Sequence, residues 1–179
     1  ILDEIEMADG KGTERWELAY NDGGTPSLQM NANGLTKIFV VVEGGVIAFH
    51  EGEAMVGALP VEPNLIMIEP AAFAQLAAIL ERYDAKKGGR QQLQVVIPSL
   101  QDYVNVEVER HGWDNILLGA ASTDVAHTRI AIGKRETVNL WSDHDRVIGI
   151  YFASKGLTVA DAAYPGLREQ LKKIVNKAL

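Results

Sequence analysis

Residues 35–51, LTKIFVVVEGGVIAFHE, are the stretch that decides how this chain is expected to fold. Apolar residues alternate along two short runs, Leu35–Glu43 and Val46–Glu51, and Gly44-Gly45 separates them. A period of two is typical of a β-strand, because successive side chains point to opposite faces of the sheet. A two-residue glycine connection between such runs is a strong hairpin signal. The stretch therefore predicts two antiparallel strands joined by a tight turn.

The same alternation recurs along most of the chain, with polar turns between the runs. Short strands at such spacing are typical of an antiparallel meander rather than of strands alternating with helices. We expect a body of strands over about residues 13–156. The further strands predicted are residues 13–20, 27–33, 65–68, 91–97, 103–109, 125–132, 137–142 and 146–152.

Two segments have the spacing of helices instead. The first covers about residues 70–83, begins with Pro70 at a position where its missing N–H is harmless, and is apolar nearly all round. Such a helix is usually enclosed by the rest of the protein. The second covers about residues 165–179 and carries its lysines toward the C-terminal end, where the helix dipole favours them. Its expected apolar stripe consists of Leu167, Leu171, Ile174, Val175 and Ala178.

Several strands are apolar on both faces, whereas an antiparallel sheet usually leaves one face to water. Residues 146–152 place Val147 and Tyr151 on one face and Ile148 and Ile150 on the other. The mid-chain helix is the natural cover for one side. The other side needs sheet closure, the C-terminal helix, a ligand or a partner. We therefore predict a mainly β fold with two helices (α+β), in which a curved antiparallel sheet or half-barrel wraps a central helix.

The composition limits the possible classes of protein. A length of 179 residues fits a single domain spanning 1–179. The net charge of −7 and the lack of a basic patch argue against nucleic acid or an anionic membrane surface as a partner. No apolar run approaches the roughly 20 residues of a transmembrane helix. The absence of cysteine excludes disulfides and thiolate metal sites. The start at Ile1, without methionine or a charged-then-apolar leader, suggests an N-terminus that is processed or trimmed.

Catalytic motifs such as a nucleophile elbow, a P-loop or H-E-x-x-H are missing from the sequence. The densest titratable cluster is Asp143-His144-Asp145, between two predicted strands. Two carboxylates beside an imidazole can bind a metal or position a general base. The same residues also form hairpin turns, and their side chains diverge, so we favour the turn.

Two other histidines lie within predicted strands. His127 shares a strand face with Arg129, and His50 lies on the face of Val46 and Ala48. Either imidazole could reach into a cavity. The alternative for both is a half-buried, hydrogen-bonded histidine.

A curved sheet around a helix would leave an apolar concavity, and such concavities bind apolar molecules. The alternative is that the sheet closes on itself and the core is simply full. Trp141, on the more polar face of its strand, could line the site or fill a small second core. The predicted ligand-binding residues are Phe73, Leu76, Leu80, Tyr83 and Trp141.

Five short motifs resemble parts of one known type of domain: LERYD (80–84), KGGRQ (87–91), VVIP (95–98), VNLWSD (138–143) and RVI (146–148). They resemble a β-rich domain of bacterial envelope proteins, which in some cases precedes a serine aminopeptidase-type α/β-hydrolase. A broader similarity is to periplasmic lipoprotein-localisation carriers, whose curved sheet wraps helices and an apolar pocket. The resemblance implies a periplasmic or envelope location rather than a cytoplasmic one. It carries no catalytic residues, because those belong to the hydrolase domain.

The leading hypothesis is therefore a non-enzymatic binding module for an apolar, lipid-like ligand, without a cofactor or metal. One alternative is an accessory domain that docks on a fused hydrolase domain or on a homodimer partner. A second alternative is a small enzyme that uses a histidine and a carboxylate inside the cavity.

Overall fold

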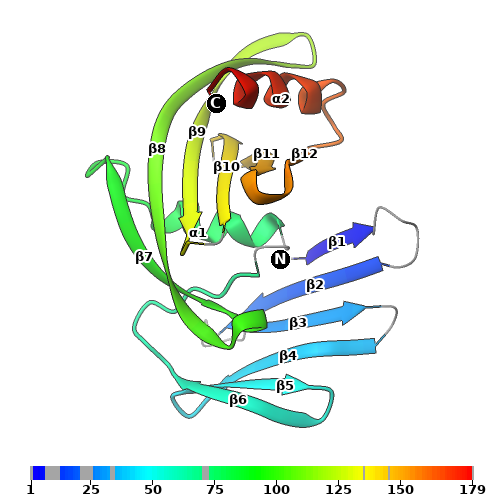
Figure 1. The fold of residues 1–179 in the computed structure, drawn as a ribbon, viewed down its shortest axis with the longest axis vertical. Coiled ribbons are helices and arrows are strands. Elements are labelled where there is room, and N and C mark those ends of the chain that lie inside the picture. Colours follow the sequence, from blue (N-terminus) through cyan, green and yellow to red (C-terminus); the bar gives the residue numbers. More distant parts are fainter. Residues whose placement is uncertain are drawn as a thin grey trace. The chain divides into compact units, whose positions relative to one another are not determined.

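A computed structural model describes residues 2–6, 13–20, 26–32, 35–69, 73–134, 136–144 and 146–178. Side-chain surroundings are described for Ser27, Gln29 and residues 40–69, 75–134, 136–144 and 146–177. Within these ranges the chain is mainly β, with two antiparallel sheets and two α-helices (Figure 1). The expected mainly β class with two helices is confirmed.

Strands follow one another in each sheet in the order of the sequence, so both sheets are meanders as predicted. The first sheet contains β1 Leu2–Glu6, β2 Thr13–Tyr20, β3 Pro26–Ala32, β4 Leu35–Glu43, β5 Val46–Glu51 and β6 Ala54–Pro60. The second contains β7 Arg90–Ile97, β8 Asp102–Leu118, β9 Ala121–Ile132, β10 Glu136–Asp143, β11 Arg146–Phe152 and β12 Leu157–Ala160. Neither sheet is closed or curled across the described residues.

The predictions from the sequence did not include the short strands β1, β6 and β12 or the second half of β8. The predicted end of β8 at residue 109 is too early because a β-bulge lies between Arg110 and Gly112. The bulge inserts an extra residue, and Gly112 has a φ of 138°, which favours glycine. Beyond the bulge, β8 continues to pair with β9 as far as Leu118.

A separate strand at residues 65–68 was predicted and is wrong. The segment forms only an isolated parallel bridge between Met67 and Val96. Its two hydrogen bonds run from Ile68 N to Val96 O (3.1 Å) and from Val96 N to Ile66 O (2.8 Å). Pro63 and Pro70 flank the segment closely, and proline cannot donate to a ladder, which leaves little room for longer pairing.

Both predicted helices exist, but the first is shorter than expected. The mid-chain segment forms a 3₁₀ turn, η1 Phe73–Leu76, that continues as α1 Ala77–Arg82, while residues 70–72 lie outside the described residues. The C-terminal helix α2, Leu167–Ala178, is close to the predicted 165–179. Two further 3₁₀ turns are η2 Pro98–Leu100 and η3 Ala153–Lys155. No helix of the described residues has the length and apolar character needed to cross a membrane.

The chain divides into two compact units. The first unit comprises residues 1–78 and 94–104, and the second comprises residues 79–93 and 105–179. The expectation of one domain over residues 1–179 stays a prediction, because compactness alone does not show that either part folds independently.

The core of the first unit lies against β4 and β5. Its buried members are Val40, Ile47, Phe49, Met67 and Val96. The alternate positions of β5 are more exposed to solvent: Ala48 and His50 are half-buried and Val46 is exposed. This part of the first sheet therefore follows the ordinary pattern of one buried and one wetter face.

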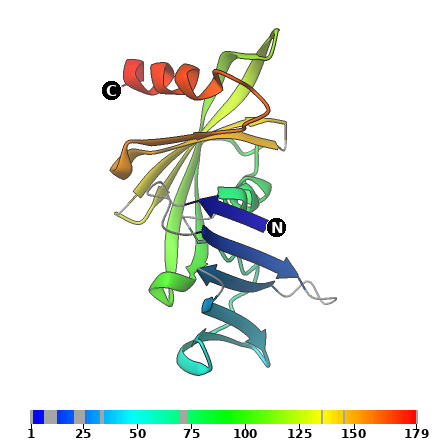
Figure 2. The same cartoon turned by 90° about the vertical axis from the view of Figure 1, so that its right-hand side faces the viewer.

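The core of the second unit shows why its strands are apolar on both sides. On β11 the residues Ile148, Ile150 and Phe152 are buried and Tyr151 is half-buried. Helix α2 covers part of one face of the sheet (Figure 2). The predicted helix stripe is confirmed at three positions, and the buried cluster consists of Ile116, Val125, Trp141, Ile148, Leu167, Leu171 and Val175.

Helix α2 lies unusually close to the sheet at Gly149. A Cβ atom built on Gly149 would overlap the Cδ1 atom of Leu171. Gln170 also fixes the helix to β8: its Nε2 donates to Leu117 O (3.0 Å) and its Oε1 accepts from Leu117 N (2.9 Å). The position of α2 therefore depends on the absence of a side chain at Gly149 and on the two hydrogen bonds that the Gln170 amide forms with Leu117.

We expect Leu171→Ala to lower the free energy of unfolding by about 2–5 kcal/mol, since it leaves a cavity in a fully buried cluster. The matched control is Lys173→Ala, on the exposed face of the same helix. This substitution should change the free energy of unfolding by no more than about 0.5 kcal/mol. Urea denaturation followed by circular dichroism measures both. Equal effects of the two substitutions would contradict the assigned role of Leu171.

Candidate functional site

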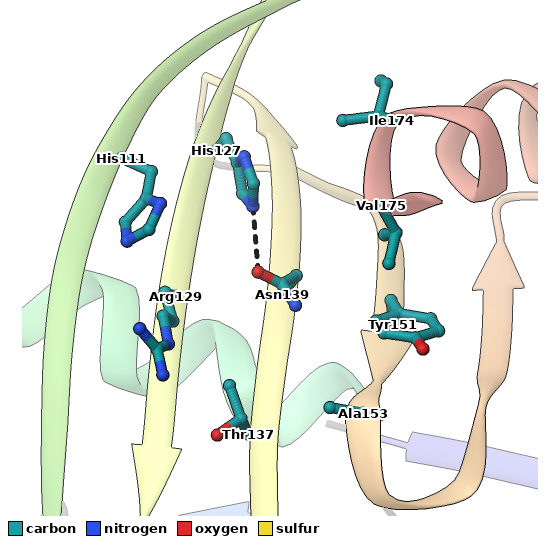
Figure 3. A pocket seen from close by; sticks show the side chains of 9 residues that line it. All are labelled: His111, His127, Arg129, Thr137, Asn139, Tyr151, Ala153, Ile174 and Val175. Carbon is teal, nitrogen blue, oxygen red and sulfur yellow. Dashed lines mark hydrogen bonds between the residues drawn. The ribbon is translucent and has the colours of Figure 1, made fainter. Parts of the chain in front are cut away.

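A cavity of about 410 Å³ lies in the second unit, between the sheet and helix α2 (Figure 3). Three strands, β9, β10 and β11, supply most of its polar wall, β8 supplies His111, and α2 supplies two apolar residues. The residues that line it are His111, His127, Arg129, Thr137, Asn139, Tyr151, Ala153, Ile174 and Val175.

Strand register explains why the lining side chains converge. Arg129 on β9 lies opposite Asn139 on β10, and Asn139 lies opposite Tyr151 on β11. His127 and Thr137 are each two residues from one of these positions and so point to the same face. The cavity therefore occupies the part of this sheet face that continues past the Trp141–Leu171 core.

A carboxylate outside the lining fixes His127 in place. Asp114 Oδ2 lies 3.1 Å from His127 Nδ1 and accepts a 2.7 Å hydrogen bond from Trp141 Nε1. The imidazole stacks on the Trp141 indole, with ring centroids 4.8 Å apart and planes inclined by 22°. Only 13% of the His127 side chain is exposed. This histidine is held on one edge by a carboxylate and on one face by a buried ring.

The second ring nitrogen of His127 faces Asn139. His127 Nε2 lies 3.1 Å from Asn139 Oδ1. A neutral imidazole that donates from Nδ1 to Asp114 leaves Nε2 as an acceptor, and Asn139 then has to present its amide nitrogen. An imidazolium would donate to both oxygens. The proton on His127 and the orientation of the Asn139 amide are therefore coupled.

Burial lowers the pKa of His127 below its ordinary value of 6.5. Desolvation is the largest cause, and it outweighs the hydrogen bonds to Asn139 and Asp114, which raise the pKa. Neighbouring His111, with ring centroids 5.6 Å apart, lowers it further. The contact with Asp114 is therefore mainly a hydrogen bond from a neutral imidazole rather than an ion pair.

The four predicted ligand residues whose side chains the structure describes do not line this cavity. Trp141 is fully buried in the core under α2. This position agrees with the alternative that Trp141 fills a second core instead of lining a site. Leu76 is buried in the first unit, while Leu80 is half-buried in the second. Tyr83 is buried there, and its hydroxyl donates to Gly89 O at 2.9 Å. The side chain of Phe73 lies outside the described residues. Ligand contact at these five positions stays a prediction.

The other candidate histidines lie away from the cavity lining. His50 is half-buried on β5 of the first unit. His144 is 93% exposed in the β10–β11 turn, has a φ of 52°, and contacts Asp143 at 2.8 Å. The favoured turn interpretation is confirmed at His144, while Asp143 is the last residue of β10. No group of three potential metal ligands occurs in the described part of the chain.

Sequence reasoning found His127 and Arg129 on one strand face but did not assemble the rest of the site. Asn139 and Tyr151 follow from that face only once the register of β9, β10 and β11 is known. Asp114 lies in the half of β8 that was not predicted as a strand, so no sequence signal placed it beside His127.

Comparisons of the chain with protein-family models, with curated proteins and with solved structures each find no match.

We expect the lowered His127 pKa to make stability depend on pH. The unfolded chain binds the proton more tightly, so the contribution of His127 is complete above about pH 6.5 and is lost as the pH falls through the window down to the native pKa. His127→Gln should flatten the slope of unfolding free energy against pH in that window, whereas His144→Gln should leave it unchanged. Urea denaturation at a series of pH values provides the measurement, and identical slopes in wild type and His127→Gln would contradict the assignment.

Proposed function

We propose that the second unit is a non-enzymatic binding module for a small, largely apolar molecule held in the cavity beside α2. The observation that carries the proposal is the cavity itself, which lies on the sheet face beside α2 and is lined in part by that helix. A volume of about 410 Å³ lies within the range of about 300–1,000 Å³ that is typical of small-molecule sites. Apolar walls with a few convergent polar groups are also typical of such sites.

The lipid-like class of the ligand and the bacterial envelope setting remain part of this proposal. Support for an apolar ligand comes from Ile174, Val175 and Ala153, which form one side of the cavity (Figure 3). An apolar chain placed there would be shielded from water by α2.

The contact between Asp114 and His127 favours a second candidate, an enzyme with a histidine general base. A base must offer one nitrogen to the substrate while the other is oriented by a third group. Asp114 supplies the orienting group at Nδ1, but Asn139 occupies Nε2 at 3.1 Å. A substrate would have to displace Asn139, so binding without chemistry is the better-supported function.

Exposed apolar side chains on β8 favour a third candidate, an interaction module. Trp113 is 63% exposed and Leu117 is 52% exposed, and their spacing of four residues puts them on the same strand face. Large exposed apolar residues that share a face are typical of protein interfaces.

We expect decanol and decanoate to stabilise the chain, by about 2.7 kcal/mol when the ligand is present at a hundred times its dissociation constant. Ala153→Trp should abolish the gain because the indole fills the cavity. Ala162→Trp adds the same ring at an exposed position outside the lining and should preserve it. Thermal unfolding with and without each ligand tests the prediction. Native mass spectrometry of freshly purified protein adds a search for retained ligand.

No stabilisation of the wild type by either compound, together with no retained molecule, would contradict the binding proposal. Equal stabilisation of Ala153→Trp and Ala162→Trp would place the ligand elsewhere on the protein.

The interaction candidate predicts a concentration-dependent dimer. Multi-angle light scattering should show that Trp113→Ser combined with Leu117→Ser shifts the chain to a monomer, because the apolar contact is lost. Leu157→Ser, at another exposed apolar position of the second unit, should leave the mass unchanged. A wild-type chain that stays monomeric at every concentration would remove this candidate.

A further inference from the structure

The cavity lining has a charge opposite to that of the chain as a whole. The chain has 24 acidic and 17 basic residues, for a net charge of −7. The described residues that line the cavity nevertheless include no carboxylate, and they include the guanidinium of Arg129 together with two imidazoles. The lining of this cavity in an acidic protein thus carries a cationic side chain, Arg129, and no carboxylate among the described residues.

Arg129 is free to serve a ligand. Across the sheet it lies opposite Glu109, but the Glu109 carboxylate is 3.4 Å from Arg90 Nη2 and 3.6 Å from His111 Nε2. In the part of the chain that the structure describes, no acid lies within ion-pairing distance of Arg129. Arg129 therefore forms no ion pair with the described residues, although Glu109 lies opposite it on the neighbouring strand.

The acid nearest to His127 is also engaged. Asp114 accepts from both Trp141 Nε1 and His127 Nδ1, and it does not line the cavity. Its charge acts on the far edge of the imidazole rather than on the space in front of Arg129.

The polar wall is suited to one negative charge. Arginine stays protonated at all physiological pH values, so Arg129 supplies one permanent positive charge. Its planar fork of N–H groups matches the two oxygens of a carboxylate. Asn139 and Thr137 add uncharged hydrogen-bonding groups to the same wall. A phosphate monoester carries more charge than this single guanidinium can balance.

The polar and apolar walls face each other. Figure 3 shows His111, His127 and Arg129 on the β8–β9 side and Ile174, Val175 and Ala153 on the α2–β11 side. A molecule that fills the cavity would present its charged end to Arg129 and its apolar chain to α2.

We propose that the ligand of this cavity is a monocarboxylate with an apolar tail, whose carboxylate pairs with Arg129 while the tail lies against Ile174 and Val175. This inference rests on the proposed binding function and adds the class of ligand. It makes Arg129 the residue that selects among molecules of similar size and apolar content.

A series of probes with the same ten-carbon tail tests the head group: decanoate, decanol, decylamine and decyl phosphate. Isothermal titration calorimetry on the full chain should give decanoate an affinity at least about tenfold higher than that of decanol, as a charge-assisted hydrogen bond would confer. Decylamine should bind more weakly than decanol, because its ammonium would lie beside Arg129.

Variants separate the head group from the tail. Arg129→Gln should lower decanoate affinity to that of decanol and leave decanol unchanged, whereas Arg129→Lys should retain part of the preference. Arg168→Gln removes an equal charge from the exposed face of α2 and should preserve the wild-type ranking. Circular dichroism of each variant shows that the fold is intact.

The outcomes distinguish this inference from the function on which it rests. Equal affinity for decanoate and decanol in the wild type, or a preference that persists in Arg129→Gln, overturns the carboxylate assignment and leaves the binding module standing. Stronger binding of decyl phosphate than of decanoate also overturns it, in favour of a phosphate monoester. Failure of all four probes to bind overturns both.

Discussion

The second unit depends on the covering of a sheet face that cannot be left to water. Residues on both sides of β11 are apolar, and α2 is the element that shields the Trp141 side. The helix covers only part of that face. Where the helix no longer covers the sheet, the strands become polar, with Asn139 and Arg129 in place of the buried cluster. The cavity is thus a direct result of a helix that covers less of the sheet than the strands extend.

Two different environments meet at His127. One side of the imidazole belongs to the core, through Trp141 and Asp114, and the other faces the cavity through Asn139. Desolvation favours the neutral ring even though two acceptors are within reach, so the loss of water outweighs the nearby carboxylate. Arg129, two residues along the strand, remains exposed and charged. The wall therefore combines a rigid neutral group with a permanent cation.

Much of the secondary structure follows from the sequence because alternation is a local property. The bounds of β2, β4, β5 and β11 match their predicted ranges, and the stripe of α2 is confirmed at Leu167, Leu171 and Val175. The missed half of β8 lies beyond a bulge, where the alternation changes phase at Gly112.

The candidate site could be predicted only in part from the sequence. His127 and Arg129 share one strand, whereas Asn139, Tyr151 and Asp114 join them through pairing with other strands, which a single sequence does not encode locally.

The close approach of Leu171 to Gly149 has an evolutionary consequence. Any homologue with a side chain at position 149 must shorten the residue at 171 or lift its helix, because the two cannot occupy the same space. Residue 149 and residue 171 should therefore covary among relatives, with larger residues at one position accompanied by smaller residues at the other. Since Val175 is one helical turn beyond Leu171 and lines the cavity, such a compensated pair would also change the width of the site, and with it the thickness of ligand that each relative accepts.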